Sequence, residues 1–118
     1  MKLSEKRRER VVEVRQATVS ALARHGKFED LGGMKAMTCT LGNVMVMYRT
    51  PFQKAAAPKS APDYDMALMR QHQEAESFGY GLDIWASHKK VLNIEWQDDR
   101  MRVASYRPGD WEDQLAAA

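Results

Sequence analysis

The chain has 118 residues, of which 44% are hydrophobic and 29% are charged, as is typical of one folded globular domain. Its net charge of +2 is too small to indicate nucleic-acid binding by itself, and its single cysteine excludes an intrachain disulfide framework. No apolar run follows the charged first residues, and none is long enough to span a membrane, so we expect a cytoplasmic protein with no membrane partner.

Residues 3–25 have the spacing of an amphipathic helix. A stripe recurs along them at steps of three and four residues, formed by Val11, Val14, Thr18 and Leu22. Ser4 is suited to cap the N-terminus of this helix, and Gly26 is suited to end it in the left-handed conformation. The sequence therefore predicts a helix at the start of the domain.

The first turns of this helix carry an excess of positive charge. Arg7, Arg8 and Arg10 could contact the phosphates of a nucleic acid. Glutamates alternate with these arginines, which argues against a dedicated nucleic-acid surface. Nucleic-acid binding through the helix is therefore a function that we consider but do not favour.

Residues 36–49 change to the two-residue period of β-strands. Apolar and other side chains alternate on both sides of Gly42 and Asn43, and this pattern predicts a β-hairpin. Residues 53–62 are rich in proline and alanine, so we expect a flexible loop there, within a single domain that spans residues 1–118.

The remaining sequence predicts one more long helix and three strands. Residues 63–78 have the apolar spacing of a helix, residues 80–107 alternate as three antiparallel strands, and Asp110 is suited to begin a short terminal helix. The strand side chains expected to face the core are Leu82, Ile84, Ala86, Leu92, Ile94, Trp96, Met101, Val103 and Ser105. The fold class is therefore α+β, with the N-terminal helix and the second helix packed on a mainly antiparallel sheet of about five strands, a hairpin plus a three-strand meander.

The meander face opposite the core combines aromatic and charged side chains. Trp85, Glu95, Arg102 and Tyr106 are expected on it, and such a group is suited to bind a ligand or a partner. The alternative, which we favour, is that the loop, the terminal helix or a second copy of the chain covers this face. The leading hypothesis is a non-enzymatic binding or interaction module that self-associates as a homo-oligomer.

A second hypothesis is a small-molecule-binding domain or a small enzyme. Its pocket would lie between the sheet and the helix of residues 63–78. Tyr64, Phe78 and Trp96 would line that pocket, and Arg49 would supply its polar contact.

Metal and cofactor chemistry has little support in the sequence. The three histidines lie far apart, and none has the spacing of a metal ligand pair. Cys39 lies within a strand pattern, where a buried cysteine usually packs as a small apolar residue. We therefore predict no metal, no cofactor and no catalytic residue.

Overall fold

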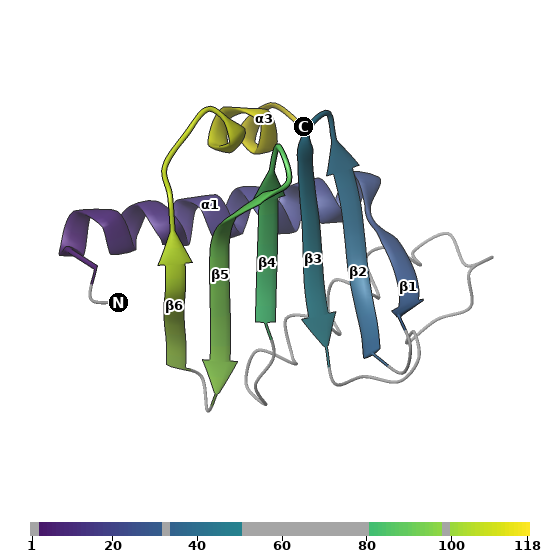
Figure 1. Cartoon of the computed structure of the whole chain (residues 1–118), viewed down its shortest axis with the longest axis horizontal. Coiled ribbons are helices and arrows are strands. Elements are labelled where there is room, and N and C mark those ends of the chain that lie inside the picture. The colour runs from purple at the N-terminus through teal and green to yellow at the C-terminus, as the bar shows by residue number, and fades with distance from the viewer. Residues whose placement is uncertain (1–2, 32–33, 51–80, 98–99) are drawn as a thin grey trace.

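The computed structural model of the chain describes residues 3–31, 34–50, 81–97 and 100–118. Its elements in chain order are α1 (Glu5–His25), β1 (Lys27–Leu31), β2 (Met34–Leu41), β3 (Val44–Thr50), β4 (Gly81–Ala86), β5 (Lys89–Gln97), β6 (Arg100–Tyr106) and α3 (Trp111–Ala117). The six strands form one antiparallel sheet in which each strand pairs with its neighbours in sequence (Figure 1). The predicted α+β class is confirmed, with six strands in place of about five.

The additional strand is β1, at the edge of the sheet. The sequence predicted no strand for this segment, in which three of the five residues are charged. Phe28 nevertheless lies opposite Met37 of β2 and packs against the core. Charged side chains on an edge strand discourage pairing with other chains, which accounts for the composition that concealed it.

Helix α1 begins and buries its residues as the sequence predicts. The backbone N–H of Arg7 donates to the hydroxyl of Ser4 at 3.2 Å, which confirms the N-cap. The residues of α1 that are buried against the sheet are Val11, Val14, Thr18, Ala21 and Leu22.

The predicted left-handed Gly26 is wrong. The residue is extended, with φ −71° and ψ 151°, as the chain turns directly into β1. A Cβ at this position would lie 2.9 Å from Cε of Met37 and would clash with the carbonyl oxygen of Leu22. Glycine is required here because the chain passes close to its neighbours, and positive φ plays no part.

The hydrophobic core lies between α1 and one face of the sheet. In Figure 1, α1 runs across the strands on the far side of the sheet, and α3 lies at the end where the β2–β3 and β4–β5 turns meet. Helix α3 packs against both α1 and β3. No described helix or strand covers the other face, which we call the open face (Figure 1).

Two bulges alter the alternation of the last strands. Between β4 and β5, the pair Ile84–Leu92 is followed by Trp85–Lys90, so Val91 is the extra residue. Between β5 and β6, the register passes over Ala104 in the same way. Each bulge reverses the facing of the residues that lie beyond it.

Tyr106 is misplaced by the sequence prediction for this reason. It was expected on the open face, but the bulge at Ala104 sets it opposite Leu92, on the core side. Only 5% of its surface is exposed. Ser105, which was expected to face the core, lies opposite Asn93 of the open face.

Several predictions fall on segments that the structure does not describe. They are the flexible loop at residues 53–62 and the helix at residues 63–78, which includes the pocket candidates Tyr64 and Phe78.

Candidate functional site

The open face is built from residues that follow one another across the paired strands. The described side chains on it include Thr38, Thr40, Met45, Met47, Arg49, Asp83, Trp85, Lys90, Asn93, Glu95, Arg102 and Ser105. One row runs through Thr40, Met45, Trp85 and Lys90, each the partner of the next on the adjacent strand. The face therefore divides into a charged part and an aromatic part.

The charged part is a network of hydrogen bonds and ion pairs around Asp83. The guanidinium of Arg49 donates to Asp83 at 2.7 Å and to Glu95 at 2.6 Å. The side-chain amide of Asn93 donates to the same two carboxylates, at 2.7 and 3.1 Å. The ammonium of Lys90 lies 3.5 Å from the second oxygen of Asp83.

Gly81 makes room for this network. It is the β4 residue between Arg49 of β3 and Glu95 of β5. A Cβ on Gly81 would clash with the guanidinium of Arg49 and would lie 2.7 Å from an oxygen of Glu95. The missing side chain thus allows Arg49 to reach across a whole strand.

The charges of this network are paired with one another. The side chain of Asp83 is 7% exposed, and both carboxylates are balanced by the guanidinium and the ammonium. Burial alone lowers the pKa of Arg49, but its hydrogen bonds and ion pairs with Glu95 and Asp83 outweigh burial and raise it above the ordinary value. Arg49 is therefore a fixed cation that holds strands together.

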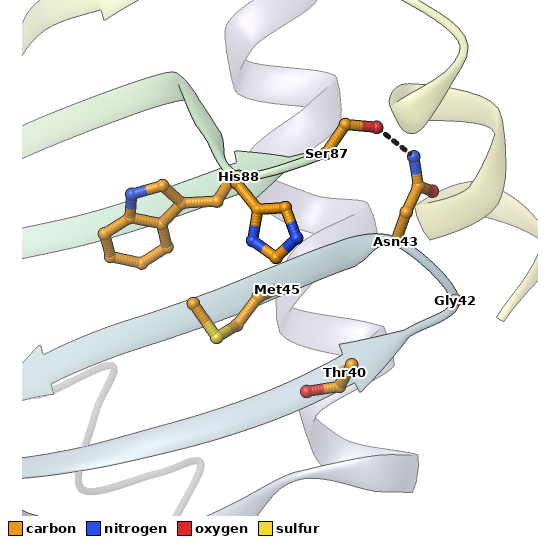
Figure 2. A pocket seen from close by; sticks show the side chains of 7 residues that line it. Thr40, Gly42, Asn43, Met45, Ser87 and His88 are labelled. Carbon is orange, nitrogen blue, oxygen red and sulfur yellow. Dashed lines mark hydrogen bonds between the residues drawn. The ribbon is translucent and has the colours of Figure 1, made fainter.

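The aromatic part contains a pocket of about 340 Å³, at the end of the sheet where two turns meet (Figure 2). Its lining consists of Thr40, Gly42, Asn43, Met45, Trp85, Ser87 and His88. The volume is near the lower end of the range of roughly 300–1,000 Å³ for small-molecule sites. A ligand that fills it would be small.

The β2–β3 turn and the β4–β5 turn are hydrogen-bonded to each other. The backbone N–H of Ser87 donates to the carbonyl of Asn43 at 3.1 Å, and the Asn43 amide donates to the Ser87 hydroxyl at 2.8 Å (Figure 2). Because Ser87 accepts from Asn43, its own O–H remains oriented for another acceptor. The β4–β5 turn has two residues, Ser87 and His88.

Trp85 forms the aromatic wall of the pocket. It is half-buried, and its register partner Met45 is 43% exposed. The ammonium of Lys90 lies 5.3 Å from the centroid of the Trp85 rings. The bulge at Val91 brings Lys90 to this face, because regular alternation from Leu92 would turn Lys90 towards the core.

The structure separates the site residues that the sequence grouped together. Trp85, Glu95 and Arg102 lie on the open face, and Arg102 is the register partner of Glu95. Tyr106 lies on the core side, where its hydroxyl donates to Glu112 at 2.6 Å.

The proposed pairing of Trp96 with Arg49 in one pocket is wrong. Arg49 lies on the open face, whereas Trp96 is 6% exposed on the core side. There the Trp96 rings lie beside Tyr48, at 6.3 Å between centroids, and the guanidinium carbon of Arg15 lies 5.6 Å from them. The two residues therefore cannot contact one ligand.

The arginines of the helix start are partly engaged within the chain. Arg8 donates to the carbonyl of Met101 at 3.3 Å. Arg10 lies 2.9 Å from Glu13 and 3.3 Å from Glu112. Arg7 contributes its backbone N–H to the helix cap. The ion pairs of Arg10 offset its charge, whereas the contacts of Arg7 and Arg8 leave their charges unneutralised.

The pocket residues Asn43, Ser87 and His88 were not among the site residues that the sequence predicted. In an antiparallel meander, the turns after alternate strands lie at the same end of the sheet. The turns at Gly42 and Ser87 could therefore have been predicted as neighbours, had the order of pairing been known.

Comparison with protein-family models, with curated proteins and with solved structures returned no match for this chain. Among the described helices, none is long and apolar enough to cross a membrane. Within the same part of the chain, no group of three or more His, Cys, Asp and Glu residues is arranged to hold a metal ion. The site is accordingly interpreted from its own geometry.

Proposed function

We propose that the chain is a non-enzymatic binding module, and that its binding site is the pocket at the turn end of the open face. The observation that carries this proposal is the contrast between the two parts of that face. The charged part is closed by internal ion pairs, whereas the aromatic part exposes Met45 and part of Trp85 beside a pocket. An aromatic residue in such a recess is a typical anchor for a ligand.

The polar groups of the pocket favour binding over catalysis. His88 is the one titratable residue among its described lining residues, and no carboxylate stands beside it to orient it as a base. The partner of the Ser87 hydroxyl is the Asn43 amide, which is a donor and cannot act as a base that activates the hydroxyl as a nucleophile. Both side chains are suited to orient a ligand.

A screen of small aromatic and aliphatic fragments, read from the indole N–H signals in NMR spectra, tests this proposal. Trp85 should respond to the fragments that bind. Trp96 and Trp111 serve as internal references, because they are 6% and 5% exposed in the core. A screen whose binders leave Trp85 unaffected contradicts the proposal, and a fragment that is converted to a new compound contradicts the absence of catalysis.

Two substitutions on the open face provide a matched pair, with fragment affinity measured by isothermal titration calorimetry because Trp85→Ala removes the indole signal itself. Trp85→Ala should weaken the fragments by about ten-fold, because stacking on an aromatic ring is lost. Met47→Ala, which alters a half-buried side chain of the same strand pair outside the pocket lining, should leave them unchanged. Equal effects of both substitutions would place the binding elsewhere.

Self-association remains a prediction of the sequence. The large hydrophobic side chains that are exposed on the described surface are Val12 at 38% and Met45 at 43%. They lie on α1 and on the open face, so they form no continuous apolar patch. Sedimentation at micromolar concentration tests this prediction, and a monomer would remove it without affecting the pocket.

A further inference from the structure

We infer that the pocket binds an aromatic ring that carries an anionic group, an inference that rests on the proposed function and specifies its ligand. Three features of the pocket lead to it. They are the surface offered by Trp85 and Met45, the sign of the surrounding polar groups, and the backbone conformation that presents His88.

The ring is indicated by the two largest side chains of the lining. Trp85 and Met45 are register partners, so their side chains lie next to each other on one face of the sheet. An indole and a thioether both make favourable contacts with aromatic rings. The pocket of about 340 Å³ has room for a ring with a short substituent.

The anion is indicated by the charges around that ring. No carboxylate occurs among the lining residues that the structure describes. Lys90 already places an ammonium 5.3 Å from the Trp85 ring centroid, where a cationic ligand would otherwise bind. Asp83 lies 3.5 Å from the Lys90 ammonium and offsets part of its charge, so Lys90 repels a cation and attracts an anion in the pocket with reduced strength.

Hydrogen-bond donors on the pocket wall suit the same ligand. The His88 imidazole can donate an N–H in either of its charge states. The hydroxyls of Thr40 and Ser87 can also donate, and the Ser87 oxygen already accepts from Asn43. A carboxylate or phosphate on the ligand would accept from these groups.

The backbone of the β4–β5 turn is unusual in a way that supports a ligand role. Ser87 and His88 have φ values of 50° and 67°, so both central residues are left-handed. Two-residue turns of this kind favour Asn-Gly, because other side chains are strained at positive φ. Here His88 occupies the position where such turns usually have glycine, and the strained conformation places its imidazole at the pocket.

Three matched probes test the inference, with the indole N–H signal of Trp85 as the readout. Phenylacetate carries a ring and an anion, phenethylammonium a ring and a cation, and cyclohexylacetate an anion without an aromatic ring. Phenylacetate should bind about five-fold more tightly than phenethylammonium, because the charge of Lys90 acts on them with opposite sign. It should also bind several-fold more tightly than cyclohexylacetate, because cyclohexylacetate cannot make the aromatic contact with Trp85.

Two substitutions test whether the charge of Lys90 determines the preference for an anionic ligand. Lys90→Met should bring the ratio between phenylacetate and phenethylammonium close to one, while both still shift Trp85. Arg102→Met removes a positive charge that lies opposite Glu95 on β6, whereas Lys90 lies over the Trp85 ring, so Arg102→Met should leave the ratio unchanged. An equal loss of the ratio in both variants would overturn the inference.

The role of His88 in ligand binding is tested by substitutions that are compatible with the backbone conformation of the turn. His88→Gly and His88→Asn both tolerate positive φ, so the melting temperature should stay the same or rise by roughly 4 °C. Both should weaken phenylacetate about three-fold or more, since a hydrogen-bond donor is lost. Unchanged affinity in these stable variants would overturn the role of His88.

The outcomes distinguish this inference from the proposed function. If all three probes shift Trp85 with equal affinity, the inference fails and the pocket remains a binding site. If none of the probes, and no fragment of the wider screen, shifts Trp85, both fail.

Discussion

Gly81 lies beneath the guanidinium of Arg49, and its lack of a side chain determines how the charges of the open face pair. Arg49 would have to withdraw from Glu95 if a methyl group were present. The side chains of Arg49 and Glu95 are 25% and 37% exposed, so solvent weakens their ion pair. The network is therefore worth a modest amount of stability, although it fixes the geometry of the face.

We predict that Gly81→Ala lowers the free energy of unfolding by about 1 kcal/mol, because it displaces the Arg49 guanidinium from a half-buried ion pair. Urea unfolding measures this change. The same substitution in an Arg49→Met background should cost clearly less, since the clash and the ion pair are both absent. Equal costs in the two backgrounds would show that the alanine acts on something other than Arg49.

The stability of helix α3 depends on specific contacts. It has seven residues, which is too short for a stable isolated helix. The indole of Trp111 donates to the carbonyl of Arg107 at 2.8 Å and packs edge-on against Tyr106, with 6.4 Å between ring centroids. Glu112 is buried, accepts from Tyr106, and lies 3.3 Å from Arg10 of α1.

We predict that Tyr106→Phe costs about 1–2 kcal/mol of unfolding free energy, because the buried carboxylate of Glu112 loses a donor. Hydrogen exchange of the α3 amides should accelerate with it. Glu112→Gln retains an acceptor for the Tyr106 hydroxyl, so we expect a smaller loss. A larger loss in the glutamine variant would mean that the charge pair with Arg10 stabilises the helix more than the tyrosine does.

The sequence predicted the regular parts of these elements and failed where one residue changes the register. Alternation located the strands β2 to β6, and helical spacing located the buried stripe of α1. The bulges at Val91 and Ala104 have no marker in the sequence, because they depend on which residue the partner strand leaves unpaired. Tyr106 was misplaced for that reason.

The candidate site was predicted only in part, because it is formed by contacts between distant segments. Trp85 was recognised as an aromatic residue on the outer face, and this position is correct. Its grouping with Met45 and His88 depends on the pairing of β3 with β4 and on the meeting of two turns. Local periodicity cannot supply such pairings, since they join residues about 40 positions apart in the sequence.

At the scale of the whole molecule, the described helix α1 covers one face of the sheet, and Cys39 and Tyr106 both belong to the core (Figure 1). Burial raises the pKa of the Cys39 thiol to about 11. Burial and the hydrogen bond to Glu112 raise the pKa of Tyr106 to about 12. Both groups are neutral when protonated, so the fold favours the protonated form of each.

The fold should therefore lose stability at alkaline pH. Without the fold, the thiol would titrate near 9.0 and the tyrosine near 10.0. Below these values both states hold the protons, and the stability is fully present. Between pH 9 and about 12 the unfolded chain binds fewer protons than the native chain, so the free energy of unfolding falls as the pH rises.

We predict that Cys39→Ala makes the decline of unfolding free energy shallower between pH 9 and about 11, whatever its effect on stability at neutral pH. The expected difference is on the order of 2 kcal/mol over that interval, from the linkage of a shift of this size. Chemical unfolding at a series of pH values measures it. Val46→Ala creates a cavity beside the same position without removing a titratable group, so its decline should match that of the wild type. If both variants flatten the profile equally, packing around Cys39, and not its ionisation, controls the alkaline response.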